Sequence, residues 1–137
     1  MALDFRPFTK SVSMLTKVRS EGKTLVWVSS NQFHIISVHS VEQIGHLEKT
    51  IILDQEAVNA TLHVDKYVWV TSGNRISLYD LDYQAVAFFD TKDVITCMTL
   101  SGDTVWTGSR EGEITAWSYK NDNFGVIKSM RTHTSPI

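Results

Sequence analysis

Thr24-Leu-Val-Trp-Val-Ser-Ser30 recurs twice in this chain, as Lys66-Tyr-Val-Trp-Val-Thr-Ser72 and as Asp103-Thr-Val-Trp-Thr-Gly-Ser109. Each copy is rich in β-branched and aromatic residues, a composition that is typical of a strand. A turn of small or polar residues follows each copy, and a second apolar segment follows the turn. The chain therefore contains three units of one structural repeat.

The spacing of these units indicates which architecture they build. The tryptophans at the repeat centres, Trp27, Trp69 and Trp106, lie 42 and then 37 residues apart. A period of about 40 residues made of strands is typical of four-stranded propeller blades. We therefore predict an all-β fold of three four-stranded antiparallel blades, which form an incomplete propeller ring.

The Val-Trp segments also predict how the blades are packed. In residues 25–28 and 67–70 every side chain is apolar, although successive side chains of a strand point to opposite faces of the sheet. A sheet with one face in water would alternate apolar and polar residues. Both faces of these sheets are therefore expected to be covered, as they are in a blade between two neighbours.

Each unit offers four segments that read as strands. The expected inner strands are 12–18, 58–64 and 94–100, and the Val-Trp segments are the second strands. The expected third strands are 33–38, 75–81 and 113–119, with Ile35, Ile76 and Ile114 equivalent and Val38, Tyr79 and Trp117 three residues later. The expected outer strands are 43–47, 84–89 and 126–130. The first unit carries extra residues within 41–59, which form either a long outer loop or an outer strand that is extended through 50–53.

The same pattern divides the chain into units. Blades 1, 2 and 3 are expected at residues 12–57, 58–93 and 94–131. Residues 1–11 are a lead-in or an outer strand of a preceding blade, and residues 132–137 begin a further blade or form a tail. Propellers typically have four to eight blades, and large apolar faces are rarely exposed in soluble monomers. We therefore expect self-association or association with further propeller blades.

Composition excludes several classes of protein. The 137 residues carry a formal net charge of −2, which argues against the clustered basic surface that nucleic-acid binding needs. No apolar run approaches the roughly 20 residues of a membrane helix, and the start of the chain lacks a secretory signal pattern, so a cytoplasmic location is expected. The single cysteine, Cys97, cannot form an internal disulfide and is expected to be buried in a strand.

The polar residues give no pattern that predicts catalysis. The five histidines include no His-x-His pair, and no Cys-x-x-Cys pair is present to begin a metal site. Carboxylates lie close together at Asp80 and Asp82, Glu111 and Glu113, and Asp54 and Glu56. Each pair lies beside a turn or strand end, where acids are commonly solvated or accept hydrogen bonds from backbone amides. We therefore expect a protein that is not an enzyme, with no catalytic residue, no cofactor and no metal.

One stretch resembles a known family. Ser101-Gly-Asp-Thr-Val-Trp-Thr-Gly-Ser-Arg-Glu-Gly-Glu-Ile-Thr-Ala-Trp-Ser118 resembles the second half of a WD repeat, with Trp117-Ser118 in the position of the Trp-Asp pair. Tyr79-Asp80 and Val38-His39 take that position in the other two units. The family's Gly-His pair is replaced by Asp54-Gln55 and Asp90-Thr91. Blade packing is therefore expected to be the main stabilising interaction.

The resemblance also implies a function. Degenerate repeats of this kind are similar to the propellers of multidomain signalling proteins, which implies a non-catalytic scaffold or regulatory module that binds proteins in cytosolic signalling. The alternative is a propeller that binds a small anionic ligand such as an inositol phosphate, with Arg75 and Arg110 as equivalent basic residues. The expected partner-binding residues lie in the turns: Asn31, Gln32, Asn74, Arg75, Arg110 and Glu111.

Overall fold

Three antiparallel sheets make up the fold. The computed structural model describes residues 14–29, 35–43, 46–53, 58–120 and 123–131, which form twelve strands in three four-stranded sheets. Blade 1 consists of β1 (Met14–Ser20), β2 (Lys23–Ser29), β3 (Ile35–Ser40) and β4 (Leu47–Ile52). Blade 2 consists of β5 (Val58–Val64), β6 (Tyr67–Ser72), β7 (Arg75–Asp80) and β8 (Ala85–Asp90). Blade 3 consists of β9 (Ile95–Ser101), β10 (Thr104–Ser109), β11 (Glu113–Ser118) and β12 (Gly125–Arg131).

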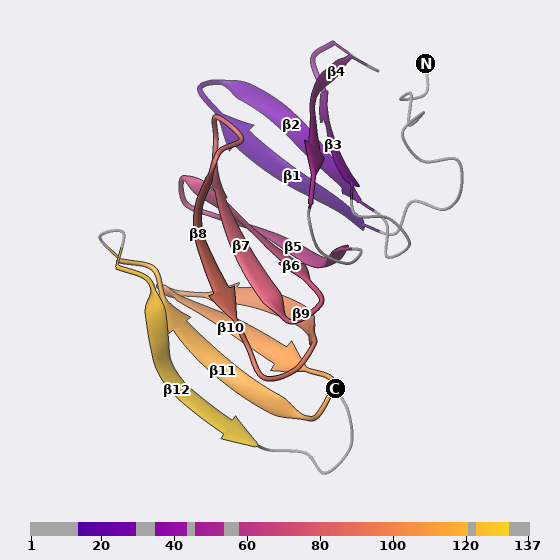
Figure 1. Ribbon diagram of the computed structural model, residues 1–137. Coiled ribbons are helices and arrows are strands. Elements are labelled where there is room, and N and C mark those ends of the chain that lie inside the picture. The colour runs from indigo at the N-terminus through magenta and orange to yellow at the C-terminus, as the bar shows by residue number, and fades with distance from the viewer. Residues whose placement is uncertain (1–13, 30–34, 44–45, 54–57, 121–122, 132–137) are drawn as a thin grey trace.

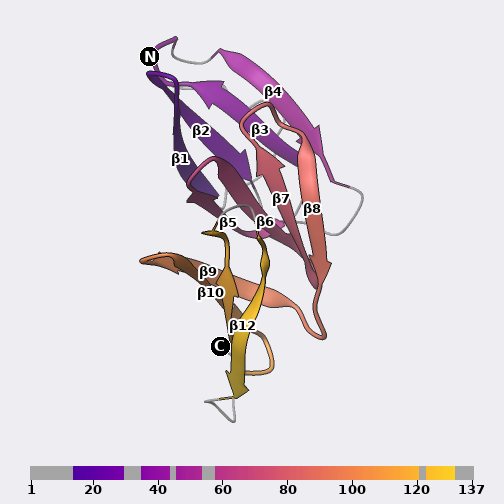
Figure 2. The same ribbon diagram turned by 90° about the vertical axis from the view of Figure 1, so that its left-hand side faces the viewer.

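The strands of each sheet follow one another in chain order, so each blade is a simple meander. Blade 2 lies between blade 1 and blade 3 in both views (Figures 1 and 2). The inner strand β5 lies beside β1 and β9, and the Thr16 and Thr61 hydroxyls form a hydrogen bond between β1 and β5. The predicted all-β fold of three four-stranded blades is confirmed.

The hairpins join the first and second strands through two-residue turns. In blade 1, Ser20 pairs with Lys23, and the intervening Glu21 and Gly22 both have positive φ angles of 49° and 79°. Two positive φ angles in a two-residue loop make a turn whose twist matches that of the flanking strands. This turn therefore supports the register that places Trp27 opposite Thr16.

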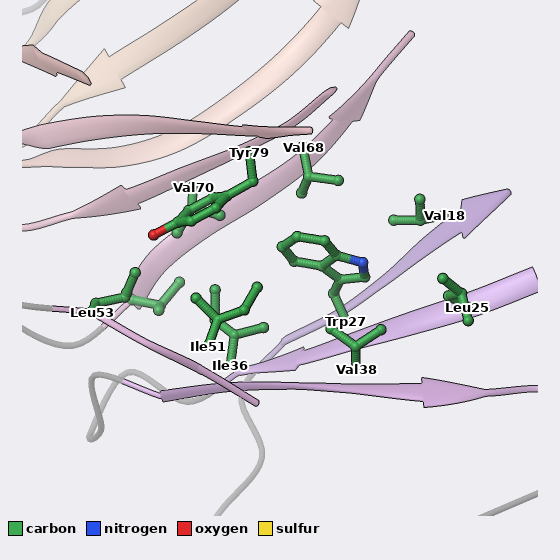
Figure 3. Close-up of a cluster of buried hydrophobic side chains, with 11 residues drawn as sticks. Val18, Leu25, Trp27, Ile36, Val38, Ile51, Leu53, Val68, Val70 and Tyr79 are labelled. Atoms are coloured by element: carbon green, nitrogen blue, oxygen red, sulfur yellow. The ribbon is translucent and has the colours of Figure 1, made fainter. Parts of the chain in front are cut away.

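The interface between blades 1 and 2 is built around Trp27, which is fully buried. Its ring centroid lies 6.2 Å from that of Tyr79 and 5.9 Å from that of Tyr83, both in blade 2. Figure 3 shows Trp27 extending from blade 1 toward Tyr79 and Val68. Burial of this apolar surface, which stabilises by about 25 cal/mol per Å², holds the two sheets together.

The interface between blades 2 and 3 repeats this arrangement with Trp69. Trp69 is fully buried, and its ring lies edge-on to Trp117 at 6.5 Å and to Phe124 at 6.3 Å. Phe89 of β8 also packs against Trp117, at 5.4 Å. All six residues of β6 are buried, which confirms for blade 2 the prediction that both faces of the Val-Trp segment are covered.

The third tryptophan has a different environment. Trp106 occupies on β10 the position that Trp69 occupies on β6, yet it is only half-buried. Hydroxyl side chains also stand where blade 2 has apolar ones, since Thr99 and Thr104 replace Leu62 and Tyr67 in register. The outer face of blade 3 is therefore more polar than the faces that lie between blades.

The prediction for the outer strand of blade 1 was wrong. This strand was expected at residues 43–47, whereas β4 spans Leu47–Ile52, in the region of the alternative through residues 50–53. The strand β3 continues to Ser40, and a turn follows in which Ser40 N donates to His46 O at 3.0 Å. Ile51 is buried at the interface with blade 2. Burial of this side chain favours residues 47–52 over residues 43–47 as the outer strand.

The third strand of blade 1 is shifted by one residue from the predicted alignment. Trp27 pairs with Val38 and Trp69 pairs with Leu78, so Val38 is equivalent to Leu78 rather than to Tyr79. His39, not Val38, is therefore the residue equivalent to Tyr79. The connection between the second and third strands has a different length in each blade. An alignment of the three units therefore does not show which residue of the third strand pairs with the tryptophan.

Cys97 also departs from its prediction, because it is exposed on the inner strand β9. It lines an open hollow of about 420 Å³ with residues of all three inner strands, including Thr16 and Asn59. A side chain that points toward this hollow has no sheet packed over it. The expectation of burial failed because this inner strand, although correctly predicted, faces an open hollow at the position of Cys97.

Candidate functional site

The expected partner-binding residues of blades 2 and 3 lie along one edge of the molecule, which we call the hairpin rim. It consists of the β6–β7 turn (residues 73–74), the β10–β11 turn (110–112) and the β8–β9 connection (91–94). Consecutive strands of a meander run in opposite directions, so these connections meet at the same end of the sheets. The β9–β10 turn and the β11–β12 connection lie at the opposite rim.

Hydrogen bonds join the two hairpins through the connection between them. Asn74 Nδ2 donates to Thr91 O and Thr91 N donates to Asn74 O, both at 2.8 Å. Thr91 Oγ1 lies 2.7 Å from Asp93 O, and Arg110 Nη2 donates to Asp93 Oδ1 at 3.3 Å. The rim of blades 2 and 3 is thus one connected polar surface.

Arg75 lies beside this network at the start of β7. Its Nε donates to Asp90 Oδ1 at 2.9 Å, and its guanidinium lies 5.2 Å from the centre of the Phe88 ring. The hydrogen bond from Arg75 is the main cause that lowers the pKa of the Asp90 carboxyl below its ordinary value. Arg75 thus joins β7 to β8 across the sheet.

The Arg75–Asp90 pair gives a prediction for titration. Asp90 in the folded protein is expected to titrate below the ordinary aspartate pKa of about 3.9, and in Arg75→Ala its pKa is expected to rise toward that value. Because the folded-state pKa is lowered, the pair stabilises the fold above the unfolded-state pKa, and this contribution is lost as the pH falls through the folded-state pKa. NMR titration of the Asp90 carboxyl carbon in both proteins measures the difference. An unchanged Asp90 titration in Arg75→Ala would show that Arg75 is not the cause.

A cavity of about 220 Å³ opens on the hairpin rim between blades 2 and 3. Its lining combines acidic and basic side chains, among them Asp93, Glu111, Glu113, Lys92 and Arg131. Asp93 Oδ2 is buried and has no hydrogen-bond partner among the described residues. An unpaired buried acceptor is costly, so a donor group that reached this oxygen would be favoured.

The structure brings together most, but not all, of the residues predicted to bind a partner. Asn74, Arg75, Arg110 and Glu111 lie on the hairpin rim or next to it, and the backbone oxygen of Glu111 accepts a hydrogen bond from Arg131 Nη1 at 2.6 Å. Asn31 and Gln32 lie outside the described residues. Whether any of these residues binds a partner stays a prediction.

Two residues of this surface were missed by the sequence reading. Thr91 and Asp93 lie in the connection between blades, outside the hairpin turns in which candidates were sought. The β7–β8 pairing, in which Arg75 is opposite Asp90, places Thr91 beside Asn74. The β9–β10 pairing, in which Ile95 is opposite Ser109, places Asp93 beside Arg110. The Asp-Thr-Lys-Asp sequence of residues 90–93 was the available signal, because polar residues between two strands indicate a loop.

Internal hydrogen bonds at the Trp-Asp position differ among the blades. In blade 3, Trp117 Nε1 donates to Thr107 Oγ1 at 3.0 Å, and Thr107 Oγ1 lies 3.4 Å from Thr115 O. In blade 1, the buried His39 takes the equivalent position, with its Nε2 3.0 Å from Ser37 Oγ. Polar contacts at this position therefore supplement blade packing in blades 1 and 3.

Among the close carboxylates, Asp80 has structural partners. Asp80 Oδ1 accepts hydrogen bonds from the backbone amides of Asp82 at 2.9 Å and Gln84 at 3.0 Å, so it supports the β7–β8 turn. Asp54 and Glu56 lie outside the described residues. Within the described part of the chain, no group of three His, Cys, Asp or Glu residues is placed to hold a metal ion.

No helix of the described residues has the length and apolar character needed to cross a membrane.

Comparison with solved structures shows similarity of fold at low sequence identity. The computationally designed Ika4 protein matches 99% of this chain with a TM-score of 0.79 and 16% identity, over 82% of its own length. Sqt1 of Saccharomyces cerevisiae matches 96% of the chain with a TM-score of 0.81 and 12% identity. A chain of the Mitotic Checkpoint Complex matches 95% with a TM-score of 0.78 and 14% identity.

The chain spans 38% of the Sqt1 chain and 42% of the checkpoint-complex chain, which is less than half of each. No family model matches the sequence, and no curated protein sequence matches it. At 12 to 16% identity the likeness is one of fold. The chain has the fold of three consecutive WD-like β-propeller blades.

Proposed function

We propose that the chain is a non-catalytic protein-interaction module that binds a partner protein through the hairpin rim. The observation that carries this proposal is the buried Asp93 Oδ2, which has no hydrogen-bond partner among the described residues and lies at the cavity between blades 2 and 3. A donor group of a partner, such as a side-chain amide or a backbone N–H, would satisfy this oxygen. The bonded Asn74, Thr91 and Arg110 would hold the surface in place around it.

The fold supports this proposal. Loops at the ends of a rigid scaffold often carry binding residues, and here two blades contribute to one rim. One of the similar folds occurs in a multi-protein assembly, the Mitotic Checkpoint Complex. A scaffold or regulatory role in cytosolic signalling, with an unknown protein partner, stays a prediction from the sequence resemblance.

The charges of the rim favour a protein partner over a small anion. Arg75 is paired with Asp90, and Arg110 is paired with Asp93. A phosphate ligand would have to separate each guanidinium from its carboxylate and would meet the negative charge of both acids. Binding of an inositol phosphate through these two arginines therefore requires a rearrangement of the rim.

Substitution of Arg110 tests the proposal. We expect Arg110→Ala to weaken capture of partner proteins from a cytosolic extract by about tenfold, or about 1.4 kcal/mol, because the substitution removes the group that fixes Asp93. The matched control is Lys120→Ala on the opposite rim. Lys120 and Arg110 are similarly exposed, at 67% and 60%, and each is paired with an aspartate.

Quantitative mass spectrometry of the captured proteins provides the measurement. Proteins that are lost with Arg110→Ala and retained with Lys120→Ala support the hairpin rim as the binding surface. Equal capture by all three proteins would contradict it. Inositol hexakisphosphate is titrated in parallel, and a rise in melting temperature that disappears in the Arg75→Ala, Arg110→Ala double variant would favour the anion-binding alternative.

A further inference from the structure

Each blade ends on an outer strand, and the three outer strands differ in a way that bears on self-association. Among the described residues, β4, β8 and β12 each pair with a single strand, so one edge of each lacks a strand partner. Such an edge offers N–H and C=O groups to another strand. Natural proteins discourage this pairing with charged residues, especially lysine.

Charge distinguishes β8 from the other two outer strands. Glu48 and Lys49 interrupt β4, and Lys128 and Arg131 lie in β12. In β8, residues 85–89 are Ala-Val-Ala-Phe-Phe, without a charge. The pairing between the third strand and the outer strand contains a β-bulge at the equivalent position in all three blades. The bulge therefore does not distinguish β8 from β4 and β12.

The one acidic residue of β8 lies at its end and is neutralised. Asp90 accepts a hydrogen bond from Arg75 Nε at 2.9 Å, and Arg75 also covers part of the Phe88 ring. The edge from Ala85 to Asp90 thus presents no uncompensated charge. Two copies of this strand can approach each other without the like-charge repulsion that Lys49 or Lys128 would meet at a symmetric contact.

The side chains of β8 are also apolar and accessible. Val86 is 46% exposed and Phe88 is 53% exposed. A groove of about 420 Å³ lies beside Phe88 between blades 1 and 2, where β4 contributes the exposed Ile52 and the charged Lys49. Figure 1 shows β8 at the left margin of the middle sheet, with no further strand beyond it.

We propose that two copies of the chain associate through β8, in antiparallel orientation, so that their two blade 2 sheets form one continuous sheet of eight strands. A two-fold axis makes the contact self-complementary. Val86 and Phe88 of each copy then form the aromatic and β-branched cross-strand pairs that stabilise antiparallel sheets. The contact lies on a different surface from the hairpin rim and does not depend on the function proposed for that rim.

The outer face of blade 3 is less suited to this role. It carries Thr99 and Thr104 where the face of blade 2 that packs between blades has Leu62 and Tyr67. Burial of these hydroxyls against a second copy would require a hydrogen-bond partner for each. Pairing along β8 instead satisfies backbone groups and covers apolar side chains in the same contact.

Val86→Lys tests the proposal, with Val126→Lys as the matched control. Both valines are exposed on an outer strand, at 46% and 56%, but only the first lies on β8. We expect the wild-type chain to sediment as a dimer in equilibrium with monomer. Val86→Lys is expected to raise the dissociation constant by about tenfold or more, which corresponds to 1.4 kcal/mol, because it places lysines near each other across the two-fold axis. Val126→Lys is expected to dimerise like the wild type.

Hydrogen exchange on the wild-type chain gives a second measurement that does not depend on a variant. Backbone amides of β8 are expected to gain protection as the protein concentration rises, while those of β4 and β12 do not. A chain that remains a monomer at all concentrations would overturn the proposal. That result would not bear on partner binding through the hairpin rim. A dimer that survives Val86→Lys, or added protection confined to β4, β12 or the Trp106 face, would also overturn it.

Discussion

Trp69→Ala is expected to lower the free energy of unfolding by about 3–5 kcal/mol, the usual cost of removing a large buried aromatic side chain. Trp69 is fully buried and lies between blade 2 and the aromatic side chains Trp117 and Phe124 of blade 3. Small proteins have a total stability of about 5–15 kcal/mol. The substitution is therefore expected to remove a large part of the stability and to separate blade 3 from blade 2.

The repeat supplies a matched control for this experiment. Trp106 has the same register on β10 but is partly exposed, so Trp106→Ala is expected to cost less than Trp69→Ala, because a smaller apolar area is returned to water. Urea denaturation followed by far-ultraviolet circular dichroism measures both variants. Equal losses would contradict the interpretation that packing between blades, rather than the tryptophan within its own sheet, is the dominant stabilising interaction.

Thr107→Val is expected to cost about 1–3 kcal/mol, the penalty for a buried polar group that loses its partner. The hydroxyl of Thr107 accepts the indole N–H of the buried Trp117 at 3.0 Å. Valine has the shape of threonine, and Val28 and Val70 occupy the equivalent positions in blades 1 and 2, fully buried. The substitution therefore removes a hydrogen bond without a change of packing.

Thr107→Ser is the control for this second substitution, since it keeps the hydroxyl and removes one methyl group. Thermal unfolding of the three proteins is expected to give a lower midpoint for Thr107→Val than for Thr107→Ser. The reverse order would show that the methyl contact of Thr107 matters more than its bond to Trp117. The result measures how much this polar contact adds to the blade packing that the sequence predicts as the main stabilising interaction.

The strand pattern could be read from the sequence where the hairpins are short. In blade 2, the inner strand was predicted at residues 58–64 and is Val58–Val64. In blade 1, the longer connection between β2 and β3 concealed a shift of one residue, so Val38 was aligned where His39 belongs. Side-chain periodicity shows which face a residue occupies, but it does not show how many residues a turn takes up.

The candidate site was predictable only in part, for a related reason. Asn74 and Arg110 could be selected because hairpin turns expose polar residues. Thr91 and Asp93, which join them, lie 17 residues away in the chain from each of these partners. The Asn74–Thr91 contact extends the pairing of β7 with β8, in which Arg75 is opposite Asp90. The Arg110–Asp93 contact extends the pairing of β9 with β10, in which Ile95 is opposite Ser109. Both contacts depend on the register of strand pairing, which the local pattern of residues does not specify.

The local pattern of residues was sufficient for the repeat, for most of the strands and for the two-sided burial of the Val-Trp segment in blade 2, because strand propensity and alternation are properties of neighbouring residues. The three tryptophans look alike in that pattern. Packing of the blades made Trp27 and Trp69 fully buried and left Trp106 half-buried, since burial depends on which sheet covers a face. The pairing of β9 with β10 placed Asp93 beside Arg110, and β8 became an edge without uncompensated charge because no further strand of the described residues pairs with it. Register and sheet edges are set by the pairing of whole strands, which residues far apart in the sequence decide together.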